Sequence, residues 1–160
     1  MVTTTKILAD RVLQRACDEP CVDWAIELLA NGNEHPATVR LATKLRPHNH
    51  FELASLRDQI LSALGMDTKT DAEVLIEYAT EILHDAAAEK RNQIETITEV
   101  KDLCITLDYH EAIYDFYSLY FAWADLQISE VQWYWQGADR SNIESLIHDR
   151  ILEFARNTQS

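Results

Sequence analysis

The sequence is poor in the residues that break helices: its 160 residues include only three glycines and three prolines. Turn-rich β-sandwiches and barrels, collagen-like chains and flexible linkers all need many more of them. The same scarcity leaves no glycine-rich loop that would hold the phosphates of a nucleotide. No segment alternates between apolar and polar residues for long enough to predict a strand. A β-protein and a nucleotide-binding α/β-protein are therefore both excluded.

Two further absences concern location. No run approaches the roughly 18 apolar residues of a membrane-spanning helix, and charged residues interrupt the apolar residues near the N-terminus, so no signal peptide is expected. Cysteine is also scarce. An odd number of cysteines in a chain with ample core indicates neither a disulfide framework nor a zinc site, and a reducing compartment is the simpler inference. The chain is expected to be cytoplasmic. The three cysteines are Cys17, Cys21 and Cys104.

What the sequence does contain is apolar residues at the helical period of 3.6 in segment after segment. Four patterns also have the spacing of capping boxes, which begin helices. We expect one all-α domain over 1–160, an irregular bundle of about eight or nine helices with no sheet. A subdivision into 1–64 and 67–160 stays open. The four capping patterns are Thr70–Glu73, Asp108–Glu111, Ser129–Gln132 and Ser141–Glu144. The expected helices cover 4–17, 20–30, 36–45, 49–64, 71–90, 93–107, 109–126, 129–137 and about 141–154.

Charge is distributed very unevenly. The net charge of the chain is −13, yet residues 1–64 carry 7 basic and 8 acidic side chains, whereas residues 65–160 carry 7 basic and 19 acidic ones. Such acidity disfavours direct binding of nucleic acid or of an anionic membrane surface. It suits a basic protein partner. It also suits self-association, in which a basic cluster in the first part of one copy would contact the acidic part of another. That basic cluster consists of Arg40, Lys44, Arg46, His48 and His50.

The acidic part also holds most of the aromatic side chains. Between Lys101 and Arg140 there is no lysine or arginine, but there are seven carboxylates and 10 of the 14 aromatic residues. On a helical wheel of the helix expected at 109–126, the acidic residues share a narrow stripe with Ser118 and Ala122, and we expect this stripe to face solvent. The aromatic run after it is too bulky to turn wholly inward from one short helix, and aromatic residues beside charges are typical of protein interfaces. The candidate partner surface is Glu111, Asp115, Asp125, Glu130, Trp133, Tyr134 and Trp135.

One dipeptide bears on catalysis. His84-Asp85 resembles the central dipeptide of the all-helical HD-type metal phosphohydrolases, and that resemblance implies His48 or His50 upstream and Asp149 downstream as further ligands. The helical phase places His84 about 170° from the apolar face of its helix, away from an inward metal cluster. Separately, Glu111 and Asp115 lie one turn apart, a spacing that suits a hard cation if another helix contributes ligands.

No nucleophile elbow, zinc-protease motif or other complete catalytic signature is present. We therefore expect a non-enzymatic interaction module without cofactor or metal, an inhibitor or immunity-type protein that neutralises a basic partner. The alternative is a metal-dependent hydrolase that takes carboxylate and histidine ligands from a helical bundle.

Overall fold

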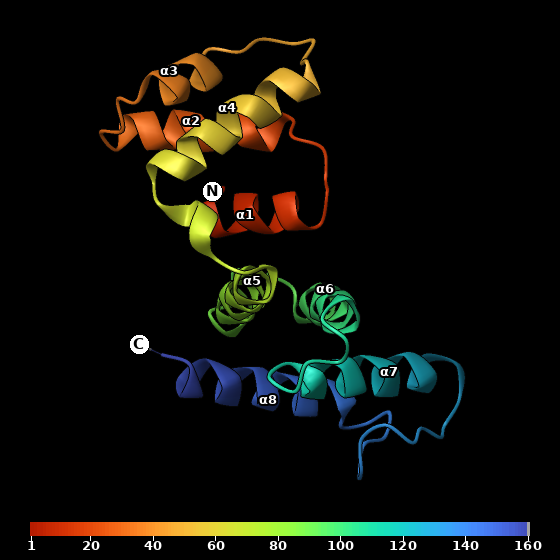
Figure 1. Cartoon of the computed structure of the whole chain (residues 1–160). Helices are drawn as coiled ribbons and strands as arrows, with labels where there is room; N and C mark the ends of the chain where they lie inside the picture. Colours follow the sequence, from red (N-terminus) through yellow and green to blue (C-terminus); the bar gives the residue numbers. More distant parts are fainter. Residues whose placement is uncertain (160) are drawn as a thin grey trace. The chain divides into compact units, whose positions relative to one another are not determined.

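The computed structural model describes residues 1–159 and is all-helical, which confirms the predicted fold class. No strand occurs in this described part, and no helix in it is long and apolar enough to cross a membrane. Figure 1 shows the eight α-helices in chain order. They are α1 (Thr4–Val12), α2 (Glu19–Ala30), α3 (Pro36–Ala42), α4 (His50–Ala63), α5 (Asp71–Ala87), α6 (Gln93–Thr106), α7 (Tyr114–Ile128) and α8 (Ile143–Asn157), with a 3₁₀ turn, η1 (Met66–Thr68), after α4.

The helices form two compact units, the first Met1–Leu75 and the second Ile76–Ser160. The division falls inside α5, about ten residues later than the subdivision left open by the sequence. In the first unit α2 packs against α1, α3 and α4. In the second unit α7 packs against both α6 and α8.

The local signals that the sequence carries explain where most helices of the first unit begin and end. The side chain of Asn49 accepts hydrogen bonds from the backbone N–H groups of Phe51 and Glu52, and so caps α4 as predicted. Gly65 ends the same helix in the left-handed region, at φ 72°, where a glycine carries no steric cost. Inside the unit, the Trp24 ring is buried and its Nε1 donates to Thr4 Oγ1 at 3.1 Å, which ties α2 to α1.

The cysteines correct one prediction. Cys17 and Cys21 form a disulfide across the start of α2, with their Cα atoms 5.9 Å apart. The disulfide forms although Pro20, in the first turn of α2, lies between the two cysteines. The argument for a reducing compartment rested on unpaired cysteines and loses that support. The cytoplasmic location stays a prediction. Cys104, by contrast, is free and buried, and burial raises the pKa of its thiol.

In the second unit, polar side chains join the helices around an apolar core. At the start of α5, still within the first unit, the capping box forms as predicted, since Thr70 N–H donates to the Glu73 carboxylate and Glu73 N–H donates to Thr70 Oγ1. The buried Tyr78 donates from its hydroxyl to Glu99 Oε1 at 2.7 Å, which joins α5 to α6. The core consists mainly of Leu83, Ile97, Val100, Cys104, Phe116, Leu119, Ile147 and Ile151.

Three of the four predicted capping boxes are wrong, and all three lie after residue 107. Asp108 has a φ of 55° and continues the turn that ends α6, so the next helix starts at Tyr114 and not at Tyr109. Residues 129–142 form no helix. The residue before α8 is Asn142, and its side chain bonds to Gly137 and Asp139 in the loop instead of capping the helix. In the loop at 129–142, local side-chain bonds to the backbone compete with the helix.

Candidate interaction site

The orientation of α7 differs from the prediction. Ser118 and Ala122, which we expected to face solvent with the acidic residues, are buried together with Phe116, Leu119 and Leu126. Small side chains fit where helices approach closely, whereas a row of rings does not. The predicted acidic stripe therefore lies at the edge of the packed face, and the outward face of α7 is aromatic.

The outward rings form a continuous cluster, which we call the aromatic cluster and which comprises Tyr109, Tyr114, Tyr117, Phe121 and Tyr134. Tyr114 stacks on Tyr117 with ring centroids 5.4 Å apart and planes 27° apart. Tyr109 meets Tyr117 edge-on at 5.4 Å, and Tyr117 meets Phe121 at 4.9 Å. Phe121 in turn meets Tyr134 at 5.4 Å. Edge-on and offset pairs at these distances are favourable, so the cluster is a stable arrangement of rings.

The aromatic cluster remains open to solvent. Tyr109 is 50% exposed, Tyr114 is 43% exposed and Tyr134 is 46% exposed. Tyr117, at the centre, is half-buried, and burial among its neighbours raises the pKa of its hydroxyl. A contiguous exposed group of aromatic rings is unusual on a monomer, so the aromatic cluster is a candidate for an interaction site.

The loop after α7 holds the predicted aromatic run. Trp133 is 90% exposed, Tyr134 lies in the aromatic cluster, and Trp135 is half-buried. Gln132 fixes this arrangement. Its Oε1 accepts from the N–H groups of Tyr134 and Trp135 at 2.8 Å each, and its Nε2 donates to the carbonyl oxygens of Trp135 at 2.6 Å and Ala138 at 3.1 Å. The side chain of Trp133 is therefore presented outward by a loop that is already ordered.

The predicted acidic residues divide into two groups. Asp115 pairs with Arg150 of α8, whose Nε donates to its Oδ2 at 2.9 Å. Glu111 lies in the exposed turn before α7, Asp125 near the end of α7, and Glu130 in the exposed loop after it. Within the part of the chain that the structure describes, none of these three forms an ion pair. Asp115 thus belongs to the packing of α7 on α8, and the other three remain available to a partner.

Sequence reasoning missed the rings of the aromatic cluster that lie on and before α7, because it assigned them to the core. A usable signal was present. Tyr114, Tyr117 and Phe121 recur at the spacing of one helical face, opposite the buried Phe116, Leu119 and Ala122. Choosing between two apolar faces of one helix requires knowing which one the neighbouring helices cover, and the sequence does not provide that.

Four of the five members of the basic cluster, all except Arg40, bond through their side chains to groups within the described part of the first unit. Glu19 accepts from Arg46 Nε at 3.0 Å and bonds His48 Nε2 at 2.8 Å, and these hydrogen bonds, that of His48 first, lower the pKa of Glu19. Lys44 pairs with Glu52. Less free positive charge is thus left in this cluster for self-association, which stays a prediction.

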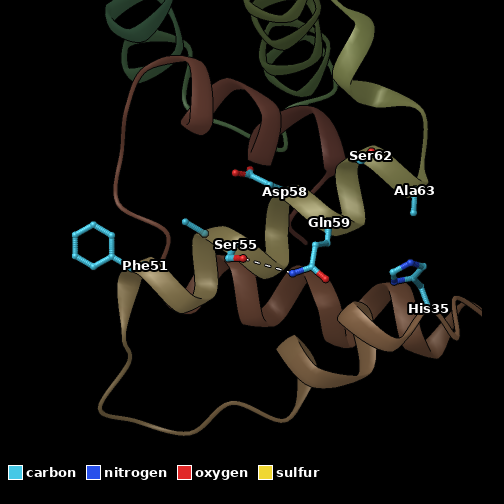
Figure 2. Close-up of a pocket in the computed structure, with 8 residues that line it drawn as sticks. His35, Phe51, Ser55, Asp58, Gln59, Ser62 and Ala63 are labelled. Carbon is cyan, nitrogen blue, oxygen red and sulfur yellow. Dashed lines mark hydrogen bonds between the residues drawn. The ribbon is translucent and has the colours of Figure 1, made fainter.

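A shallow pocket of about 860 Å³ lies along the outer face of α4 in the same unit (Figure 2). It contains a serine, a histidine and an aspartate, but they do not form a catalytic triad. His35 Nδ1 accepts from Ala37 N–H and caps α3, Ser55 Oγ accepts from Gln59, and Asp58 pairs with arginines. A nucleophile needs a hydrogen bond to its base, and none connects these three side chains among residues 1–159.

The possible metal ligands are scattered. His84 is half-buried and its Nε2 bonds Thr158 Oγ1 at 2.7 Å within the second unit, whereas His48 and His50 belong to the first unit. Among the residues that the structure describes, no group of three or more His, Cys, Asp or Glu side chains is arranged to hold a metal ion. The alternative of a metal-dependent hydrolase therefore has no set of ligands in this part of the chain.

Comparison with known proteins finds no matching protein family, no similar curated sequence and no similar solved structure. A function for this chain has to be argued from its own surface.

Proposed function

We propose that this chain is a non-enzymatic interaction module that binds a basic protein through the aromatic cluster and the loop that carries Trp133. The observation that carries the proposal is the exposure of Trp133, 90% of whose surface is open to solvent on a loop held by four hydrogen bonds of Gln132. Tryptophan and tyrosine are the residues most enriched among those that dominate binding energy at interfaces.

The order of the loop supports the proposal. Ordering side chains and loops on binding costs free energy, and a surface that is ordered beforehand avoids that cost. Exposed apolar side chains continue around Trp133, since Ile128 and Val131 are also exposed. A partner that covers Trp133 would remove a substantial apolar area from water.

The unpaired carboxylates support a partner with a positively charged surface. Glu111, Asp125 and Glu130 belong to a segment that contains no lysine or arginine. Complementary charge accelerates association and disfavours partners of the wrong sign. A basic protein surface fits this segment, and a module that covers such a surface acts as an inhibitor wherever the surface is the functional site of the partner.

The test uses the full chain as bait in three forms: unchanged, Trp133→Ser and Phe51→Ser. Phe51 is the matched control, because it is a 91% exposed ring in the first unit. Each retained protein is identified and purified, and its affinity for all three forms is measured at low and high salt.

We expect a basic protein that binds the unchanged chain and Phe51→Ser equally well, binds Trp133→Ser about 30-fold more weakly, and is released by salt. The proposal is overturned if no protein distinguishes Trp133→Ser from the unchanged chain. It is equally overturned if the protein that does so is acidic at the contact or indifferent to salt.

A further inference from the structure

The second unit already contains one arginine bound by a ring and a carboxylate together. The guanidinium carbon of Arg150 lies 5.5 Å from the centroid of the Phe116 ring, and its Nε donates to Asp115 Oδ2 at 2.9 Å. A guanidinium is suited to this combination because it is planar, stacks on a ring face, and donates hydrogen bonds in its own plane. Phe116 and Asp115 are neighbours in sequence on α7.

The outward side of the same unit also has rings and carboxylates that follow one another closely in the sequence. Exposed tyrosines of the aromatic cluster each have a carboxylate close by in sequence: Asp108 precedes Tyr109, Glu111 lies three residues before Tyr114, and Glu130 lies four residues before Tyr134. The backbone N–H of Tyr114 donates to the carbonyl oxygen of Glu111 at 3.4 Å, so this pair shares one tight turn.

The second unit leaves these sites without a cation of its own. Asp108, Glu111 and Glu130 form no ion pair within residues 1–159. Lys101 lies over the Tyr120 ring, 4.5 Å from its centroid, and pairs with Asp102 at 2.6 Å, so its charge is already engaged. A cation of a partner would supply the charge that these sites lack.

We propose that the aromatic cluster recognises arginine side chains, so that the partner presents an arginine-rich segment to it. This inference rests on the proposed function and specifies the chemistry of its partner. Arginine is favoured over lysine because a guanidinium is weakly hydrated and binds ring and carboxylate simultaneously, whereas an ammonium is a compact, strongly hydrated point charge.

The test compares two peptides of equal charge, blocked hexa-arginine and blocked hexa-lysine, titrated calorimetrically into the full chain. We expect hexa-arginine to bind at least about five-fold more tightly. The double variant Tyr109→Leu/Tyr114→Leu keeps apolar side chains but loses two ring faces. It should reduce the arginine advantage to less than about two-fold, while its affinity for hexa-lysine stays within about two-fold of that of the unchanged chain.

Two further variants separate charge from stacking. Asp108→Asn/Glu111→Gln should weaken both peptides, and Phe51→Leu in the first unit should weaken neither. Circular dichroism establishes that each variant is folded, and the single variant Tyr114→Leu replaces the double one if the double variant is not. The inference is overturned if the peptides bind equally, if neither binds, or if the arginine advantage survives in the tyrosine variant. A Trp133-dependent basic partner with equal peptide affinities refutes only the arginine preference, whereas the absence of such a partner refutes the proposed function itself.

Discussion

The two units of this protein differ in how far their charged side chains are paired. The first unit, residues 1–75, has 8 basic and 11 acidic side chains, and most of its cations form ion pairs inside the unit: Lys6 pairs with Asp10, Lys44 with Glu52 and Arg46 with Glu19. The second, residues 76–160, has 6 basic and 16 acidic side chains, so most of its carboxylates have no counter-charge available. Net charge alone did not reveal which charged groups are free.

The units differ in the same way in their aromatic residues. The first unit buries its only tryptophan, Trp24, whereas the second leaves Trp133 exposed beside a cluster of exposed tyrosines. An aromatic or charged residue therefore indicates an interaction only where its own unit neither covers the ring nor neutralises the charge. Both conditions hold together for the aromatic cluster and the carboxylates near it in sequence, whereas in the described part of the first unit the exposed ring of Phe51 stands alone.

The two tryptophans give the largest expected contrast. Trp24→Ala removes a buried ring and its hydrogen bond to Thr4, and should lower the free energy of unfolding by about 3–5 kcal/mol. Trp133→Ala removes an exposed ring and should change that free energy by less than about 0.5 kcal/mol. Urea unfolding followed by circular dichroism measures both. A loss of several kcal/mol in Trp133→Ala would show that this side chain is part of the core, and would remove the basis of the proposed function.

Acid should change the stability of the two units differently. This effect should be smaller than that of Trp24→Ala, because the ion pairs are exposed. In the first unit, hydrogen bonds from His48 and then Arg46 lower the pKa of Glu19, and a hydrogen bond from Lys44 lowers the pKa of Glu52, both from an ordinary value of 4.5. A carboxyl whose pKa is lowered by folding stabilises the fold above its unfolded pKa, and this stabilisation disappears as the pH falls through the lowered value.

We therefore expect the first unit to lose stability as the pH falls through 4.5 and below, and Glu19→Gln to flatten that dependence. The matched variant is Glu34→Gln, since Glu34 is exposed and forms no ion pair among the described residues. Hydrogen exchange of amides in each unit, measured at about pH 7 and about pH 4, reports the stability of each unit separately. Equal slopes for the unchanged chain and Glu19→Gln would contradict the assignment.

How well the sequence predicted the structure changes at about residue 107. Before it, helices begin at signals that act over three residues, such as Asn49 and the Thr70–Glu73 box, and these were correctly located. After it, similar spacings mislead, because Asp108 adopts a positive φ and Gln132 bonds to the backbone of its own loop. A capping pattern does not show whether a helix or a side-chain-bonded loop is more stable.

The candidate site was predicted in part. The sequence predicted that at least one of Trp133, Tyr134 and Trp135 stays at the surface, because one short helix cannot bury three large rings, but it did not say which one. In the structure Trp133 is 90% exposed and Tyr134 is 46% exposed. It assigned the wrong face of α7 to solvent, because hydropathy ranks Ser118 and Asp115 as outward, whereas Ser118 is small enough to be enclosed and Asp115 pairs with an arginine 35 residues away. Pairings at such sequence separations depend on tertiary packing.

The smallest expected effect comes from the carboxylates that have no partner. Glu111→Gln/Glu130→Gln removes two exposed negative charges from the unit that has an excess of them, and should raise the free energy of unfolding by a few tenths of a kcal/mol at low salt. The gain should vanish as salt screens the repulsion. Asp115→Asn is the matched control. It removes the partner of Arg150, whose Nη1 is already buried without a hydrogen bond, and should lower the free energy of unfolding by about 0.5–1 kcal/mol at any salt concentration. If the double variant were instead destabilised as Asp115→Asn is, Glu111 and Glu130 would have cation partners in solution, and the second unit would resemble the first.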